Sequence, residues 1–178
     1  MKNLIAVFFA FFVASCSTIP SNSSSASGGL LVFPMDVTKK VGSGPWFNYN
    51  FHFRDVDTNE KHFVKAITKL NQNYYVSPRI PPGNYEMFRW EAISKNLRQV
   101  EERDILYQFT VAEGTISVFG ALIEVKSDAK YQYTQIKPIS FAKAKSVLEE
   151  IALDNPNIHD WYMIYGSDGS AIEIEEQH

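Results

Sequence analysis

Phe47-Asn48-Tyr49-Asn50-Phe51-His52-Phe53-Arg54 is the stretch of sequence that decides the fold. Aromatic rings occupy every second position in it, and polar side chains occupy the positions between them. A period of two residues is typical of a strand that has one buried and one solvent-facing side. We therefore expect a strand here, with its phenylalanine and tyrosine rings in the hydrophobic core.

This strand has a natural partner directly after it. Turn-forming residues follow at 55–60, and the segment 62–67 returns as a second strand, which together predict a hairpin. With the turn centred near Asp57, the imidazoles of His52 and His62 would lie opposite each other on adjacent strands. They are the candidate metal ligands of the chain. Zinc sites usually take about three or four ligands, so the alternative is two ordinary surface histidines and no metal.

Further along the chain, the pattern predicts more strands and one helix. Ser140 can cap a helix, and apolar residues between Phe141 and Ala152 recur at the spacing of a single helical stripe. The sequence Asp154-Asn155-Pro156 would end that helix, and an Asp-Gly turn at 168–169 between two alternating runs predicts a terminal hairpin. The remaining predicted strands are at 30–35 and 130–136, and the segment 109–115 that runs into 116–123 predicts two apolar strands about a glycine turn.

These expectations define a fold class and its boundaries. Aromatic and β-branched residues are frequent, which favours strands. We expect a mostly β protein: an antiparallel β-sandwich with one C-terminal amphipathic helix and a terminal hairpin. Residues 30–136 would form the sandwich, and residues 137–178 would form the helix and the hairpin packed on it.

A proline-glycine motif lies in the middle of the predicted sandwich, at Ile80-Pro81-Pro82-Gly83-Asn84-Tyr85-Glu86-Met87. Pro82 and Gly83 suit the two central positions of a type II turn, because the third residue of such a turn needs a positive φ. The motif resembles the turn and strand of small β-sandwich modules, the transthyretin-like or carboxypeptidase-regulatory-like group, which also occur in uncharacterised bacterial envelope lipoproteins. Any antiparallel sandwich with such a turn is the alternative.

Two further glycines carry expectations. Gly114 separates two apolar runs, which resembles the later hairpin of the same modules. Gly120 lies within the second run, where a glycine indicates a bulge or a close backbone approach.

The first sixteen residues indicate export. Lys2 is followed by an apolar run of ten residues, which is shorter than the roughly 20 residues of a membrane-spanning helix and fits a secretory signal. The run ends in Val13-Ala14-Ser15-Cys16, which resembles the lipobox of bacterial lipoproteins. That resemblance implies cleavage before Cys16 and acylation of its thiol and new amino group. The alternative is an ordinary signal peptide in which Cys16, the chain's single cysteine, is incidental.

The segment after Cys16 is rich in serine and glycine. Residues 17–29 read STIPSNSSSASGG, which has little apolar surface to offset the entropy of ordering. We expect a flexible tether over residues 16–29, after a signal peptide over residues 1–15. Ser17 stands where an aspartate retains many lipoproteins in the inner membrane, so the resemblance implies a lipid-anchored location in the cell envelope, at the outer membrane.

Composition and motifs exclude several functions. Removal of residues 1–15 would leave 163 residues with a net charge near −4 and no basic block, which disfavours nucleic acid as a partner. The chain has no G-x-S-x-G elbow, no phosphate-binding glycine loop and no H-E-x-x-H motif. We therefore expect a protein that is not an enzyme and has no cofactor. It would be a binding or assembly module whose partners are membrane lipid through Cys16 and an envelope protein or glycan. The alternatives are an envelope enzyme, a polysaccharide-processing accessory or a metal-binding module.

Five aromatic residues are the candidate binding surface, because alternation does not assign all of them to one buried face. Exposed rings can stack on sugars or anchor protein partners. The alternative is that the five rings fill a second layer of the core under the helix. The residues are Trp46, Tyr74, Tyr75, Phe88 and Trp90.

Overall fold

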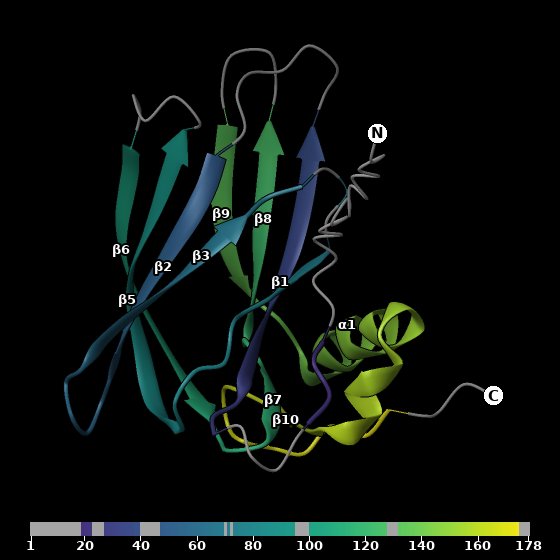
Figure 1. Cartoon of the computed structure of the whole chain (residues 1–178). Helices are drawn as coiled ribbons and strands as arrows, with labels where there is room; N and C mark the ends of the chain where they lie inside the picture. Colours follow the sequence, from purple (N-terminus) through teal and green to yellow (C-terminus); the bar gives the residue numbers. More distant parts are fainter. Residues whose placement is uncertain are drawn as a thin grey trace, which may run out of the picture.

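The computed structural model of this chain describes residues 19–22, 27–39, 47–69, 71, 73–94, 100–127 and 132–174. Strands dominate this part of the chain, which also contains one α-helix near its C-terminal end (Figure 1). The expectation of a mostly β protein with a C-terminal helix is therefore confirmed. In chain order the elements are β1 (Leu30–Lys39), β2 (Phe47–Asp55), β3 (Lys61–Ile67), β4 (Tyr74–Val76), β5 (Gly83–Ser94), β6 (Val100–Val111), β7 (Thr115–Val118), β8 (Ala121–Ser127), β9 (Gln132–Pro138), α1 (Phe141–Asp154), the 3₁₀ helix η1 (Pro156–Asp160) and β10 (Tyr162–Tyr165).

The strands form two sheets. The first, which we call the mixed sheet, has the order β10-β7-β1-β8-β9, with β4 also paired to β1. The second, the four-stranded sheet, is antiparallel with the order β3-β2-β5-β6. The expectation of purely antiparallel sheets is wrong for the mixed sheet, because β1 pairs in parallel with both β7 and β8, and β10 pairs in parallel with β7.

The predicted hairpin is confirmed as β2 and β3. Tyr49, Phe51 and Phe53 are buried, as the alternation of β2 predicts, and the side chain of Phe47 lies outside the described residues. Phe51 faces Val64 across the hairpin.

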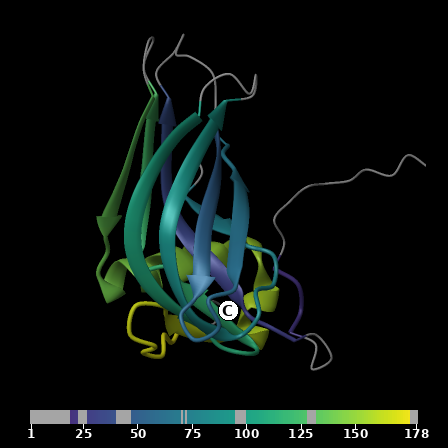
Figure 2. The ribbon, with the colours of Figure 1, turned by 90° about the vertical axis from the view of Figure 1, so that its left-hand side faces the viewer.

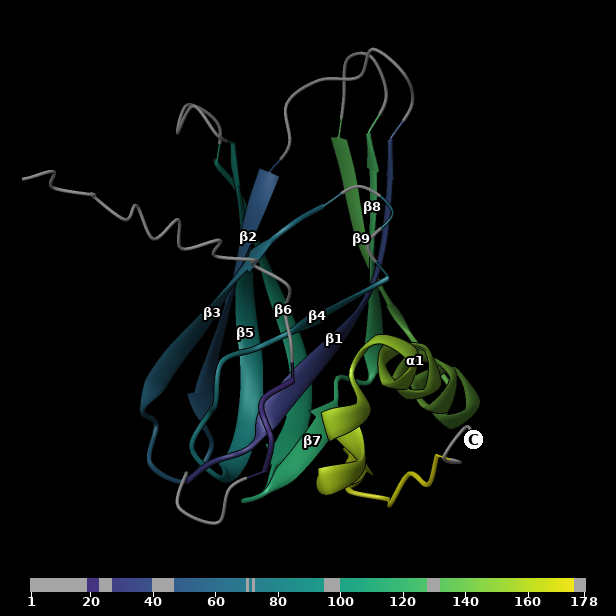
Figure 3. The same ribbon diagram turned by 45° about the vertical axis from the view of Figure 1, so that its right-hand side comes forward.

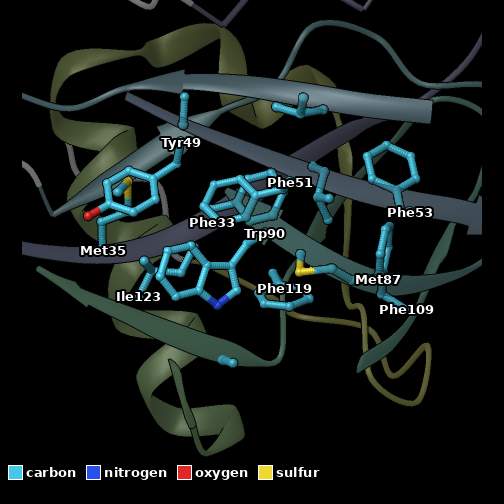
Figure 4. Packing of buried hydrophobic residues seen from close by; sticks show 14 of the residues in the cluster. Phe33, Met35, Tyr49, Phe51, Phe53, Met87, Trp90, Phe109, Phe119 and Ile123 are labelled. Atoms are coloured by element: carbon cyan, nitrogen blue, oxygen red, sulfur yellow. The ribbon is translucent and has the colours of Figure 1, made fainter. Parts of the chain in front are cut away.

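The core between the two sheets is largely aromatic (Figure 4). Phe33 of β1 stacks on Phe51 of β2, with ring centroids 4.9 Å apart. It also contacts Phe119, at 5.4 Å. Offset and edge-on contacts of this kind add to the free energy gained from burial alone. The residues of β1 that enter this core are the odd-numbered ones from Leu31 to Val37.

A second core lies on the other face of the mixed sheet, under α1 (Figure 3). Leu30 and Val32, the even-numbered residues of β1, pack there with the buried stripe of the helix. The predicted stripe is confirmed for Ala144, Val147, Leu148 and Ile151. Its first member, Phe141, is instead 40% exposed. The predicted cap is present: the Ser140 Oγ accepts a hydrogen bond from the Lys143 amide at 3.3 Å.

The two glycines that the sequence assigned to turns, Gly83 and Gly114, behave differently from expectation. Gly83 has no positive φ and is the first residue of β5, so the type II turn is wrong. It lies against the carboxylate of Asp55, where a Cβ would clash, so close approach explains the glycine. Gly114 does form a turn, with φ +68°. That turn carries the chain from β6 in one sheet to β7 in the other, so the predicted pairing of these two runs is wrong.

Two other expectations are confirmed in outline. A Cβ at Gly120 would clash with the side chain of Ser167, so Gly120 does allow a close approach, although by a side chain rather than by the backbone that was predicted. The terminal hairpin consists of β10 and a single bridge between Ile164 and Ala171.

The expectation that the whole segment 16–29 is a flexible tether is wrong for residues 19–22. Ile19 is only 1% exposed and belongs to the second core, packed with Leu30, Leu148 and Ile158.

Candidate functional site

The outer face of the four-stranded sheet is the candidate site, and Figure 2 views the molecule from that side. Because facing residues of an antiparallel pair share one side of the sheet, the pairing places Asn50, His52 and Phe63 on the side opposite the core. Phe63 is 64% exposed, and Leu106 of the edge strand β6 is 75% exposed. Exposed apolar side chains grouped on one sheet face are typical of an interaction surface.

A polar cluster lies in the middle of this face. Asn50 of β2 donates a hydrogen bond from Nδ2 to the Glu91 Oε2 of β5, at 3.2 Å. The Nε2 of His52 lies 3.1 Å from the same carboxylate oxygen. Contact with the His52 imidazole, followed by the hydrogen bond from Asn50, lowers the pKa of the Glu91 carboxyl below its usual range. The cluster is thus an anionic carboxylate held in place by two neighbours.

Aromatic rings flank the cluster on both sides. The imidazole of His52 lies 6.0 Å from the ring of Phe63 on β3 and 6.2 Å from the ring of Phe88 on β5. The Lys61 ammonium group lies 5.8 Å from the centroid of the Phe88 ring. The face therefore combines apolar rings with a charged centre. In binding surfaces, apolar rings contribute affinity and charged groups orient the partner.

A β-bulge places Phe88 on this face. The register between β2 and β5 pairs Phe53 with Met87 and His52 with Arg89, so Phe88 is an extra residue in β5. A bulge bends a strand and re-aims a side chain. Met87 before it and Trp90 after it both point into the core.

Of the proposed aromatic residues that the structure describes, which are Tyr74, Tyr75, Phe88 and Trp90, Phe88 alone lies on this face. Tyr74 and Tyr75 are half-buried on β4 of the mixed sheet, where they pack against the second core and the inter-sheet core respectively. Trp90 is 3% exposed and part of the inter-sheet core, so its indole is not available to a partner. Trp46 and the lipidation residue Cys16 lie outside the described residues.

The proposed histidine pair is wrong. His52 faces Phe63 across the hairpin, and His62 faces Phe53, so the two imidazoles point to opposite sides of the sheet. His62 instead packs on the rings of Phe53 and Tyr85, with centroids at 5.7 and 5.6 Å. A register offset of one residue is enough to move a side chain to the other face. No group of three or more potential metal ligands occurs in the described part of the chain.

The one signal for this face in the sequence is the polar half of the β2 alternation. Phe63 and Leu106 are apolar residues at outward-facing positions of β3 and β6, which is visible in the sequence only once the register is known. Alternation could not assign Phe88 to a face of the sheet, because the bulge interrupts the in-and-out alternation of side chains along β5.

A groove between the edge strands β6 and β9 is an alternative candidate site. It has a volume of about 360 Å³ and is lined by Trp90, Arg103 and Lys137, among others. Its cationic groups already have partners: the Arg103 guanidinium lies 5.9 Å from the Trp90 ring centroid, and the Lys137 Nζ lies 2.9 Å from Glu124. We therefore place the candidate site on the outer face of the four-stranded sheet rather than in this groove.

Comparisons with known proteins give a distant structural likeness. Neither a family model nor a curated protein matches the chain. Among solved structures, the chain is similar to part of a leucine-rich repeat protein from Bacteroides thetaiotaomicron, with a TM-score of 0.36 and 12% sequence identity. The likeness covers 72% of this chain and 16% of that protein. Across the described residues, no helix combines the length and the apolar character needed to cross a membrane.

Replacing His52 with alanine should raise the pKa of Glu91 toward its usual range, because the first of its two neighbours is lost. A carboxyl group whose pKa is lower in the folded protein than in the unfolded chain stabilises the fold at pH values above the unfolded pKa. That contribution is lost as the pH falls through the folded pKa. Carboxyl NMR titration of Glu91 measures the change. His62→Ala, on the other side of the sheet, is the matched control, and an unchanged Glu91 titration in His52→Ala would contradict the cluster.

Proposed function

We propose that this chain is a lipid-anchored protein of the bacterial cell envelope, held through Cys16, and that its folded domain is a non-enzymatic module that binds an envelope protein. The anchor is supported by the apolar run of residues 4–13, by the lipobox-like Val13-Ala14-Ser15-Cys16 and by the lack of a second cysteine in the sequence. Ser17 supports the outer membrane as the location. More than one acyl chain on Cys16 would make the attachment stable, since a single chain binds only reversibly.

The observation that carries the binding role is the outer face of the four-stranded sheet. Phe63 and Leu106 expose most of their apolar surface there, on either side of the His52–Glu91 pair. Aliphatic together with aromatic side chains favour a protein partner over a glycan, because sugars stack on ring faces. The Glu91 carboxylate and its two bound neighbours would orient that partner.

The sandwich fold of the transthyretin-like or carboxypeptidase-regulatory-like group is part of the same proposal. It is supported by the aromatic core that the two sheets share and by the strand that begins at Gly83. The type II turn of the Ile80–Met87 motif does not support it, because Gly83 has no positive φ. The parallel pairing of β1 is the feature that this resemblance does not explain.

The anchor is tested by the mass of the mature amino terminus. We expect cleavage before Cys16 and a diacylglyceryl and amide-linked acyl mass on that residue. A Cys16→Ser variant should move from the membrane fraction to the soluble exported fraction. An unmodified thiol in the wild-type protein, or an unchanged partition of the variant, would contradict the anchor.

The binding face is tested by site-specific photo-crosslinking in intact cells. A photoreactive residue replaces Phe63 in one strain and Tyr133 in another; Tyr133 is a matched aromatic control, 54% exposed on the edge strand β9. We expect a discrete protein adduct from position 63 that is absent from position 133. Equal adducts at both positions, adducts with glycan alone, or no adduct at position 63 would each contradict a protein-binding role for this face.

A further inference from the structure

Residues 19–22, which we call the clasp, are bound to the domain although they belong to a serine-rich segment. The Ile19 amide donates to the Asn155 Oδ1 at 3.1 Å, and Asn157 donates from Nδ2 to the Ile19 carbonyl at 3.3 Å. Next to them, the indole Nε1 of Trp161 donates to the Pro20 carbonyl at 2.8 Å. Both backbone groups of Ile19 are therefore satisfied by side chains more than a hundred residues away in the sequence.

The far end of the clasp is also fixed. The Asn22 Nδ2 donates to the Gly114 carbonyl at 3.2 Å and to the Asp160 carbonyl at 3.1 Å. Ser21, between the two contacts, is exposed. These bonds join the segment to the turn after β6 and to η1, so it bridges two parts of the fold.

The site that receives Ile19 is part of the folded domain. Ile19 lies in the second core with Ile158 and the stripe of α1. Trp161, which binds the next carbonyl, is 3% exposed and has the Arg79 guanidinium 4.5 Å from its ring centroid. Polar side chains that satisfy a buried backbone give a defined geometry as well as affinity. The contact is therefore specific, in contrast to the behaviour expected of a serine-glycine linker.

We infer that the clasp sets both the distance and the direction at which the domain is held from the membrane. This inference rests on the proposed acylation of Cys16. Only Ser17 and Thr18 separate Cys16 from Ile19, and three residue steps span at most about 10 Å. A free coil of the thirteen residues 17–29 would instead have a typical end-to-end distance of about 20 Å and no preferred direction.

The direction follows from the order of layers (Figure 3). The clasp and α1 lie on one face of the mixed sheet, and the inter-sheet core lies on the other. Beyond that core comes the four-stranded sheet, whose outer face is the candidate site. The clasp thus attaches the anchor on the side of the molecule opposite the candidate site, and turns Phe63 and Leu106 away from the membrane that holds the protein.

A pair of insertions tests the clasp in the lipidated protein, reconstituted in vesicles. Six Gly/Ser residues are inserted either between Thr18 and Ile19 or between Ser24 and Ser25. A Glu113→Cys substitution, at an exposed residue next to Gly114, carries a fluorophore, and nitroxide-labelled lipid headgroups quench it on close approach. We expect the first insertion to reduce quenching at least twofold and the second to leave it unchanged. Equal losses from both insertions would overturn the clasp, because a free tether senses only total length.

A second readout does not depend on the lipid. Hydrogen exchange at the backbone amide of residue 19 is measured in the Cys16→Ser chain, with and without a further Ile19→Ser substitution. The amide should exchange at least tenfold more slowly when residue 19 is isoleucine, because burial of that side chain holds the segment in place. Ser21→Ala is the matched control and should keep full protection. Exchange of the Ile19 amide at the rate of a free coil would overturn the clasp. An unmodified Cys16 in the mass spectrum with a protected Ile19 amide would instead refute only the anchor.

Discussion

Strand β1 is the element on which the rest of the structure depends, because its two faces belong to different hydrophobic cores. Its odd-numbered residues pack between the two sheets, and Leu30 and Val32 pack under α1. Along its length it pairs with β7 through residues 30–32 and with β8 through residues 35–39, and β4 pairs with it through residues 32–34. Strands buried on both sides are apolar at nearly every position, which explains the run Leu30-Leu31-Val32-Phe33.

This arrangement separates the two functional ends of the molecule. The second core collects α1, η1, β10 and the clasp on one side of the mixed sheet. The aromatic core and the four-stranded sheet lie on the other. In the proposed function, attachment to the membrane and binding of a partner therefore use opposite sides of one small domain.

Local patterns in the sequence predicted the local parts of the structure. The β2–β3 hairpin follows from alternation and turn residues, and α1 follows from its stripe and its Ser140 cap. The pairing of β1 with β7 and β8 was not predictable, because it joins residues 86 to 88 positions apart and depends on tertiary packing rather than on propensity.

The candidate site was predictable only in fragments, for the same reason. His52 and Phe88 were identified as candidates, but their relation depends on the hairpin register and on the bulge in β5. Trp90 was assigned to a binding surface, yet the bulge returns it to the core. The clasp was missed because its composition resembles a linker, although Ile19 is an isolated large apolar residue within it.

Unfolding followed separately in the two cores tests most directly whether β1 unites them. Trp90 reports on the inter-sheet core and Trp161 on the second core. Two double Trp→Phe variants each keep one of these residues as the sole tryptophan, whose fluorescence is excited selectively. Circular dichroism of each variant corrects for the stability change that the substitutions cause. If β1 couples the cores, fluorescence and circular dichroism should give coincident urea transitions in both variants. A Trp161 transition at lower urea than the loss of strand signal would contradict the account, because the second core would then unfold alone.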